Sequence, residues 1–549
     1  MPDTTGIYGE RKDSLEAAVF VSRQAGNYLS KGKEIRTEVI SAAGLCKMAC
    51  CSLAESFENS ASVTVGYADA VTGARQIRLL GQNGIYTQML DENRPVMRGL
   101  SAPFGLNYVP GQWLESIQIS KGPTSVSNGG EAITGQINME HRKPTDETPL
   151  FVQLYGSLDR MYEANIASAI QFNEKWSMIN MGHVGGTASR MDHNSDGFRD
   201  EPENLQFNFT SRWLYYAPSG MQIRFGFRYI NDNRLGGQMG ATKDNAFNLI
   251  NGIWGSNIVN NGLNGYLKVG VPLNEDNTAN IAMVADFNHH EFDSFFGLKT
   301  FDGDQDSWFL NIIFQDEISE LHKVEAGLTA KSDKFGQVMT DFNQKYPIRP
   351  IDLSFRESSL AAFGEYTFTL DDKITFVGGL NIEYNDRHGW LFAPRANLKY
   401  SFSDEIIFRA LGGRGFRCSN FFTDNLGMFS TGRQILPDEN LNTMEDAWTF
   451  GGNITFYLPF GYDGENTYLS FDYFRNEFVD QVIVDQECTA GAVCLYNLDG
   501  RSFTDTYQVD FNVDPFERFN IVATFRYTDA MVDLRGQGLV ERPMTSRYK

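Results

Sequence analysis

The chain is short of features that mark several common classes of protein. Its 549 residues include only 6 cysteines, too few and too scattered for a fold built on disulfides. No stretch approaches the roughly 20 apolar residues that a membrane-spanning helix needs. The second shortage does not exclude a membrane, because the strands of a transmembrane barrel alternate apolar with polar residues and look soluble on average.

The chain also has fewer positively than negatively charged residues, and its start does not resemble an export signal. The chain has 47 Lys and Arg against 69 Asp and Glu, which gives a net charge of −22. Because phosphate binding needs clustered Lys and Arg, nucleic acid is not an expected partner. Residues 1–5 are polar, and the start of the chain lacks the apolar core of a signal peptide. Either the protein is cytoplasmic or a leader precedes residue 1, and the rest of the sequence favours the leader.

The chain is rich in glycine and in aromatic residues, with 52 Gly, 42 Phe and 23 Tyr. In segment 221–230, apolar side chains occupy every second position, which is the period of a strand, over the length that a tilted strand needs to cross a bilayer. The same texture recurs from about residue 148 onward, at 151–157, 205–216, 280–287, 360–370, 374–384, 449–458, 467–473, 507–513 and 521–527.

The connections between these segments alternate between short and long. Short turns follow residues 216, 370 and 513, and long polar loops are expected at 189–203, 234–262, 332–354 and 414–443. Short turns on one side and long loops on the other are typical of outer-membrane barrels. We therefore expect an all-β, antiparallel transmembrane barrel; a soluble β-helix or a large sandwich is the alternative.

Residues 35–145 have a different, mixed α/β texture. A short helix is expected within 52–59, and short strands are expected at 76–80 and 117–119. Glycine and asparagine supply the turns between them. The sequence thus predicts a small separate domain ahead of the barrel.

The segment 113–144 carries a long motif and reads WLESIQISKGPTSVSNGGEAITGQINMEHRKP. It resembles the end of the plug domain of TonB-dependent outer-membrane receptors. The matching positions include Lys121, Gly122, Pro123, Gly129 and Gly135. Gly122 and Pro123 impose a turn, and the glycines permit close backbone packing inside a crowded lumen.

Further segments resemble the same family in the same order along the chain. They are 75–81 and 88–95 in the plug, and 414–420 and 436–441 in the barrel, with Cys418 where the family commonly has Ala. The resemblance implies three parts: an N-terminal segment at 1–34, a plug domain at 35–145 and a barrel at 146–549.

The resemblance also implies what the protein does. Such a receptor is not an enzyme and needs no cofactor; it imports a scarce nutrient such as siderophore-bound iron, haem, cobalamin or another metal chelate. Its partners would be TonB with its inner-membrane energising complex, the chelate and outer-membrane lipid, in a Gram-negative bacterium. A passive porin or adhesin-type barrel is the alternative, and a soluble enzyme acting on glycans is a third possibility.

The two ends of the chain carry two further expectations. Segment 15–21 resembles a TonB box, which would add as a strand to a sheet of TonB; an ordinary strand or a tail is the alternative. The box consists of Leu15, Glu16, Ala17, Ala18, Val19, Phe20 and Val21. The family barrel has about 22 strands, and the chain offers roughly 17 candidates before Lys549. We therefore expect an open sheet, with strands missing at the C-terminal end and a leader missing at the other.

An acidic segment at 192–203 reads DHNSDGFRDEPE and matches the pattern of an EF-hand loop. Hard oxygen ligands at these spacings suit Ca²⁺, and a structural Ca²⁺ ion would stiffen an extracellular loop. The alternative is a solvated acidic loop. The expected ligands are Asp192, Asn194, Asp196, the Phe198 carbonyl, Asp200 and Glu203.

The cysteines suggest two more sites. Cys46, Met48, Cys50 and Cys51 are spaced so that they could bind a soft metal ion; buried thiols or a local disulfide are the alternatives. The pair Cys488 and Cys494 is placed to close a loop disulfide, as in an oxidising compartment, or to remain two free thiols.

Overall fold

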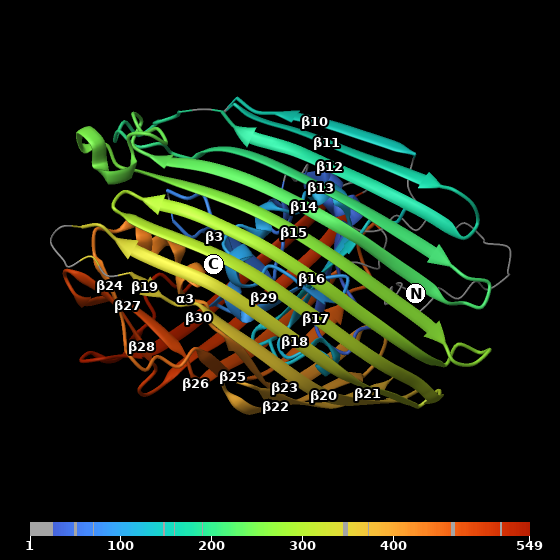
Figure 1. Ribbon diagram of the computed structural model, residues 1–549. Coiled ribbons are helices and arrows are strands. Elements are labelled where there is room, and N and C mark those ends of the chain that lie inside the picture. Colours follow the sequence, from blue (N-terminus) through green and yellow to red (C-terminus); the bar gives the residue numbers. More distant parts are fainter. Residues whose placement is uncertain are drawn as a thin grey trace.

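The computed structural model consists of a curved antiparallel sheet that wraps around a small N-terminal domain (Figure 1). The residues that it describes are 26–48, 52–69, 71–145, 149–158, 160–188, 190–343, 348, 350–371, 373–462, 467–516 and 519–549. Among them, no helix has the length and apolar composition to cross a bilayer.

The large sheet has 19 strands, and each strand pairs with the strands that precede and follow it in the chain. The strands β24 (Gln434–Pro437), β27 (Val482–Thr489) and β28 (Ala492–Asn497) are skipped because they belong to a separate small sheet. The strands of the large sheet are β10 (Leu150–Gly156), β11 (Met161–Gln171), β12 (Trp176–Thr187), β13 (Glu203–Tyr216), β14 (Gln222–Gly237), β15 (Gly255–Pro272), β16 (Ala279–Phe296), β17 (Lys299–Ser319), β18 (His322–Asp341), β19 (Ile351–Asp352), β20 (Phe355–Leu370), β21 (Ile374–Asn385), β22 (Gly389–Ser401), β23 (Ile406–Cys418), β25 (Met444–Tyr457), β26 (Tyr468–Asp480), β29 (Ser502–Phe516), β30 (Phe519–Leu534) and β31 (Gly538–Glu541). Within the described residues no pairing joins the outermost strands β10 and β31, so the sheet is open, as expected.

The outer face of this sheet carries an apolar band. On β17 the outward positions are exposed and apolar: Trp308, Leu310, Ile312 and Phe314. Their neighbours in the chain, such as Asn311, point inward and are buried. Since soluble proteins do not present such a band to water, the pattern fits a lipid-facing surface with an aromatic residue at its rim.

The same strands continue beyond the apolar band. Towards the start of β17 the outward positions become acidic, at Asp302, Asp304 and Asp306. Opposite them on β16 lie His289, Glu291 and Asp293. The strands therefore rise above the level at which lipid tails cover them.

This overrun corrects the expected loop boundaries. The loop predicted at 234–262 is only 238–254, because β14 and β15 extend into it with outward polar residues such as Asn257 and Asn261. Strand β18 likewise runs to Asp341 and β23 to Cys418, inside the loops predicted at 332–354 and 414–443. Polar outward side chains had suggested loops, whereas they mark strand segments that leave the membrane.

The long connections gather at one end of the sheet and the short turns at the other. One long loop contains α3 (Phe421–Asp424), η7 (Leu426–Ser430) and β24 (Gln434–Pro437), and the next contains β27 (Val482–Thr489) and β28 (Ala492–Asn497). β24, β27 and β28 form a small sheet of their own, at the left of Figure 1. Because long loops are extracellular in this architecture, that end faces out of the cell.

The N-terminal domain contains a six-stranded mixed sheet in the order β1-β2-β8-β9-β6-β7. Its elements are β1 (Asn27–Leu29), β2 (Thr37–Ser41), α1 (Ala42–Met48), α2 (Leu53–Ser56), β3 (Val63–Tyr67), β4 (Arg75–Leu79), β5 (Gln82–Asn83), η1 (Gly84–Tyr86), β6 (Thr87–Asp91), β7 (Arg94–Pro95), η2 (Gly99–Ser101), η3 (Gly105–Asn107), η4 (Gly111–Trp113), β8 (Leu114–Lys121), η5 (Val126–Asn128) and β9 (Gly135–His141). The short helix and strands expected here are present, and β1 places the start of the sheet ahead of residue 35.

Two glycines of the 113–144 motif lie where a side chain would not fit. Gly122 has a φ of +81°, and a Cβ there would lie 2.6 Å from the side chain of Leu411 on β23. Gly135 has a φ of +154°, and its Cβ would lie 2.3 Å from the carbonyl oxygen of Ser120. A side chain at either position would push the domain away from the barrel wall or split β8 from β9.

Candidate ligand and metal site

A cavity of ≈ 150 Å³ lies between the N-terminal domain and the barrel wall. On the domain side it is lined by the turn Met97, Arg98 and Gly99, and on the barrel side by residues such as Phe335 and Cys418. Phe335 and Cys418 belong to the ends of β18 and β23 that lead into long loops. The cavity is therefore at the end of the barrel that carries the long loops.

The domain turn is held tightly against β17 and β18. The backbone N–H of Leu100 donates a hydrogen bond to Gln305 Oε1 at 2.9 Å. Gly99 has a φ of +59°, and a Cβ there would lie 2.5 Å from Gln305 Oε1 and 2.6 Å from the ring of Phe335. Only glycine lets the turn approach the wall so closely, which makes the turn a fixed floor for the cavity.

One side of the cavity is a chain of ion pairs. Arg98 lies 3.0 Å from Glu131 and 3.5 Å from Asp333, and Lys331 lies 3.1 Å from Glu131 and 3.6 Å from Glu383. Burial alone would raise the pKa of Glu131, but Arg98 and Lys331 outweigh it and lower that pKa to about 2. This side thus carries fixed charges of both signs at neutral pH.

The long loop after β23 lines part of the cavity and packs against the barrel wall. Its rings Phe421, Phe422 and Phe429 are buried and contact Phe301 of β17 directly or through one another. They belong to one apolar cluster with Leu100 of the domain turn. At the long-loop end of the barrel, the contact between the domain and the barrel is therefore apolar and closely packed.

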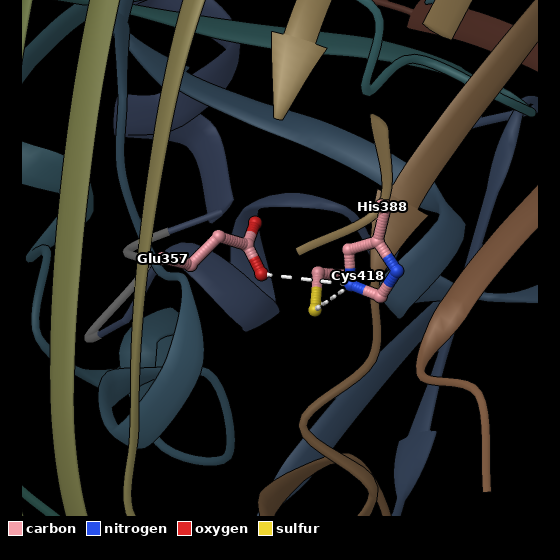
Figure 2. Close-up of side chains that lie close together, drawn as sticks. All are labelled: Glu357, His388 and Cys418. Atoms are coloured by element: carbon pink, nitrogen blue, oxygen red, sulfur yellow. Dashed lines mark hydrogen bonds and ion pairs between the residues drawn. The ribbon is translucent and has the colours of Figure 1, made fainter. Parts of the chain in front are cut away.

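Three potential metal ligands, two from separate strands and one from a turn, meet beside the cavity. Glu357 is near the start of β20, His388 is in the turn between β21 and β22, and Cys418 ends β23 (Figure 2). Cys418 Sγ lies 3.9 Å from His388 Nε2, which lies 3.8 Å from Glu357 Oε2. Among the described residues, this is the one group of three His, Cys, Asp or Glu side chains close enough to share an ion.

Deeper in the lumen the contact between domain and barrel becomes ionic. Asp91 accepts from Arg94 at 2.9 Å and from Arg228 of the barrel at 2.7 Å, and lies 3.2 Å from His141. Burial would raise the pKa of Asp91, but these three groups hold it well below its usual range. Arg94 also reaches Asp286 of the barrel at 2.6 Å.

A second ionic group lies nearer the short-turn end. Arg36 lies 2.8 Å from Asp472 of the barrel and also pairs with Asp510. Lys121 of the motif donates to the same Asp472 at 2.7 Å. Burial lowers the pKa of Lys121 to about 8, with Arg36 adding to the effect. Both groups tie the domain to the wall by buried charges.

The carboxylates proposed for Ca²⁺ do not come together. Asp192 accepts from the backbone N–H groups of Asp196 and Gly197, and Asp200 is bound by His193 at 2.6 Å. Glu203 instead pairs with Arg190 at 2.7 Å. In the described part of the chain these groups form no shared cluster, so Ca²⁺ binding stays a prediction.

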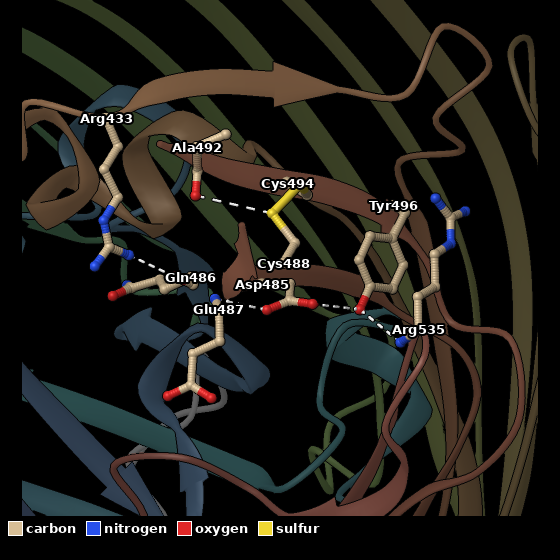
Figure 3. Close-up of a disulfide and its surroundings, with 9 residues drawn as sticks. All are labelled: Arg433, Asp485, Gln486, Glu487, Cys488, Ala492, Cys494, Tyr496 and Arg535. Carbon is tan, nitrogen blue, oxygen red and sulfur yellow. Dashed lines mark hydrogen bonds between the residues drawn. A yellow bond between two sulfur atoms is a disulfide. The ribbon is translucent and has the colours of Figure 1, made fainter. Parts of the chain in front are cut away.

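The remaining predicted sites have different outcomes. Cys488 and Cys494 are joined in a disulfide with a Cα–Cα distance of 6.2 Å, across the β27–β28 hairpin (Figure 3). Cys46 is an exposed free thiol on α1. Met48 is described only by its backbone, and Cys50 and Cys51 lie outside the described residues, so the soft-ion site stays a prediction. The TonB-box candidate at 15–21 also lies outside them.

The Glu357–His388–Cys418 group was not predicted from the sequence. Cys418 was noted only as a departure from the family pattern, and Glu357 and His388 carry no local motif. The cysteine itself was the available signal, because it stands where the family commonly has Ala.

Comparison with known protein families matches both parts of the chain. Residues 175–546 match the model described as TonB dependent receptor-like, beta-barrel, and residues 33–136 match the TonB-dependent Receptor Plug Domain. Among curated proteins, no sequence matches.

Several solved structures share the fold. The siderophore receptor PirA from Pseudomonas aeruginosa is 15% identical, with 92% of this chain and 86% of that chain covered and a TM-score of 0.65. The ferripyoverdine receptor of the outer membrane of Pseudomonas aeruginosa, bound to ferripyoverdine, is 12% identical, with 96% and 76% covered and a TM-score of 0.72. The copper transporter OprC is 12% identical, with 94% and 82% covered and a TM-score of 0.69.

At such identities the likeness shows the fold, while the family models identify the family. The N-terminal domain is the plug, and the curved sheet is the receptor barrel. This chain belongs to the TonB-dependent receptors, which are outer-membrane uptake proteins of Gram-negative bacteria and not enzymes.

Proposed function

We propose that this receptor imports a small metal-containing ligand, which first binds in the cavity above the plug turn 97–99. The observation that carries the proposal is the composition of that cavity. It combines fixed charges of both signs, at Arg98 and Glu131, with a wall that holds the Cys418 thiol and the Glu357 carboxylate, and His388 lies beside both of these. A charged metal chelate needs such polar contacts in an otherwise enclosed pocket.

Import past the plug would need energy. The plug is tied to the barrel by buried ion pairs at Asp91, Arg36 and Lys121, and separating any of them exposes an unpaired buried charge. Ligand binding in the cavity does not touch these pairs. We propose that TonB supplies the force from the periplasm, by pairing with the extended segment 15–21.

A passive porin is less well supported. Porins keep an aqueous channel through the lumen. Here the plug sheet and its loops lie inside the curved sheet (Figure 1), and plug side chains contact the wall at both the apolar and the ionic levels.

The test is an uptake assay in cells that carry the complete receptor. Cells would be given labelled ferric siderophore, haem, cobalamin or a copper or zinc complex, with and without TonB. We expect one of these to enter only when TonB is present. TonB-independent entry, or no entry of any of them, would contradict the proposal.

A pair of variants places the ligand in the cavity. Arg98→Ala removes a cavity charge and is expected to raise the half-saturating ligand concentration at least tenfold. Arg535→Ala removes an arginine that is half exposed and paired with Asp438 outside the cavity, and should leave uptake unchanged. Equal effects of the two substitutions would place the ligand elsewhere.

A further inference from the structure

The donor atoms of Glu357, His388 and Cys418 are arranged like the ligands of a metal ion (Figure 2). All three lie within 4.8 Å of one another. A tetrahedral ion with bonds of about 2.0–2.3 Å to sulfur, nitrogen and oxygen would hold these atoms roughly 3.5 Å apart. The observed separations of 3.9 and 3.8 Å need only a small inward movement of the side chains.

One of these donor atoms lacks a hydrogen-bond partner. Glu357 Oε2 is buried and accepts no hydrogen bond in the described structure, although Arg387 lies 3.6 Å away. Its other oxygen, Oε1, accepts from Asn385 Nδ2 at 2.9 Å. Arg387 supplies a positive charge at 3.6 Å, and Oε2 retains the capacity to accept a closer contact from an ion held by His388 and Cys418.

Asn385 connects two of the three ligands. Its amide nitrogen holds Glu357, and its Oδ1 accepts from the backbone N–H of His388 at 3.1 Å. Asn385 is itself buried. Such supporting groups fix the orientation of metal ligands, and their loss typically weakens metal binding about 10–100-fold.

The chemistry of the three ligands selects a class of ion. A thiolate with an imidazole and one carboxylate suits borderline transition metals such as Zn²⁺, whereas Ca²⁺ and Mg²⁺ prefer oxygen alone. Three protein ligands leave a fourth position free for water or a carrier ligand. Since Glu357 and Cys418 line the cavity, an ion held here would be reached from the extracellular side.

We propose that Glu357, His388 and Cys418 bind a borderline transition-metal ion directly, as the first protein site for the metal that the receptor imports. The inference rests on the proposed function and narrows it. Protein side chains bind the metal ion itself, so that recognition does not depend on the chelator alone. On binding, Cys418 releases its thiol proton to solvent and its sulfur forms the bond to the ion.

The competing reading is a hydrogen-bonded group without a metal. Cys418 Sγ also lies 3.4 Å from Thr443 Oγ1, and a thiol can satisfy itself there. On that reading Glu357 Oε2 keeps its contacts with Arg387 and His388, at 3.6 and 3.8 Å, without accepting a short hydrogen bond. The two readings differ in whether the purified receptor takes up an ion.

The experiment is titration of the complete, detergent-purified receptor with Zn²⁺ by calorimetry, and with Co²⁺ by absorption spectroscopy. We expect Zn²⁺ binding that Cys418→Ser and His388→Ala each weaken at least tenfold, and Asn385→Ala about 10–100-fold. Bound Co²⁺ should show thiolate-to-cobalt charge-transfer absorption, which Cys418→Ser removes.

Matched controls separate this site from other cysteines and histidines. His322→Ala changes a histidine at the short-turn end of β18 and should bind Zn²⁺ like the parent. Cys46→Ser changes the exposed thiol of the plug and measures any separate Zn²⁺ bound by the plug cysteines. Folding of every variant is checked by its heat-modifiable mobility in gels. If Cys418→Ser fails this check, His388→Ala in the surface turn carries the test.

The outcomes distinguish the inference from the proposed function. No Zn²⁺ binding by the parent, or equal binding by parent, Cys418→Ser and His388→Ala, overturns the inference even if TonB-dependent uptake of a chelate is found. Zn²⁺ binding at these residues without any TonB-dependent uptake supports the site and overturns the proposed function.

Discussion

The plug meets the barrel in two chemically different ways. At the extracellular end, Leu100 and Phe104 pack into an apolar cluster with barrel and loop rings such as Phe301 and Phe422. Deeper in the lumen, Asp91 and its neighbours join the two parts by buried charges. An apolar contact loses its stabilisation in proportion to the area that water reaches, whereas a buried ion pair resists small displacements and is weakened once water enters.

The difference suggests separate tasks for the two levels. The apolar level involves no charged groups, so salt should not weaken it. The ionic level resists displacement of the plug, because separating its groups leaves buried charges without partners. Substitutions at the two levels should therefore differ in size and in their dependence on salt and pH.

The largest effect is expected from Asp91→Ala. It leaves Arg94 and Arg228 as buried charges without a shared partner, at a cost of about 3–5 kcal/mol in the free energy of unfolding. Denaturant unfolding of the plug, followed by protease sensitivity, measures it. The control Asp438→Ala breaks the exposed pair with Arg535 and should cost at most about 1 kcal/mol. Similar losses in both variants would show that the deep ion pairs do not hold the plug.

A smaller effect is expected at the apolar level. Leu100 is fully buried, and Leu100→Ala should cost about 2–4 kcal/mol by loss of contacts and creation of a cavity. The cost should not change between low and high salt, since no charge is involved. Leu273→Ala, at an exposed position beyond β15, is the control and should cost little. A salt-dependent loss in Leu100→Ala would remove the distinction between the two levels.

A pH-dependent effect is expected at Glu140 of β9. Burial, with the nearby charge of Glu92, raises the pKa of Glu140 from 4.5 to about 8. The folded state therefore prefers the protonated carboxyl. The contribution of Glu140 to the free energy of unfolding is fully present below about pH 4.5 and is lost as the pH rises through about 8.

Glu140→Gln keeps an oxygen that can accept the 2.7 Å hydrogen bond from Asn138 and removes the titration. The variant should melt at a higher temperature than the parent at pH 9 and at the same temperature at pH 4. Thermal unfolding at the two pH values is the measurement. An equal shift at both would mean that the carboxyl does not titrate between them.

The smallest effect is expected from Asp196→Ala, which lies in the acidic loop and outside both contacts between plug and barrel. Without Ca²⁺ the change should stay within about 0.5 kcal/mol. With Ca²⁺, calorimetry on the complete receptor is expected to show binding that this substitution removes. If the parent binds no Ca²⁺, the segment is a solvated acidic loop, in which Arg190 already neutralises the charge of Glu203.

Much of the fold could be predicted because it repeats. Alternation with a period of two marks each barrel strand, and the motif around Gly122 and Gly135 marks the plug by close approaches that only glycine permits. The strand ends were predicted too short, because hydropathy reports lipid contact and the outward Asn257 and Asn261 lie above the lipid.

The candidate metal site could not be predicted in the same way. Glu357 and Cys418 lie on different strands and His388 lies in a turn, so their meeting depends on the register between β20, β21, β22 and β23. Strand register sets which side chains share a level in the barrel, and no local pattern in the sequence reports it. Only Cys418 stood out, through its replacement of a common alanine.

The height of the barrel has a consequence for the ligand. Gln305, which anchors the plug turn, lies on β17 between the outward Asp304 and Asp306, above the rim residue Trp308. Each residue adds about 3.3 Å along a strand, so the cavity floor stands clear of the hydrocarbon slab. An ion captured there is bound above the slab, and it reaches the level of the hydrocarbon only during transit through the polar lumen. Capture and passage are thus separated by level, and a receptor stalled without TonB should still hold its ligand.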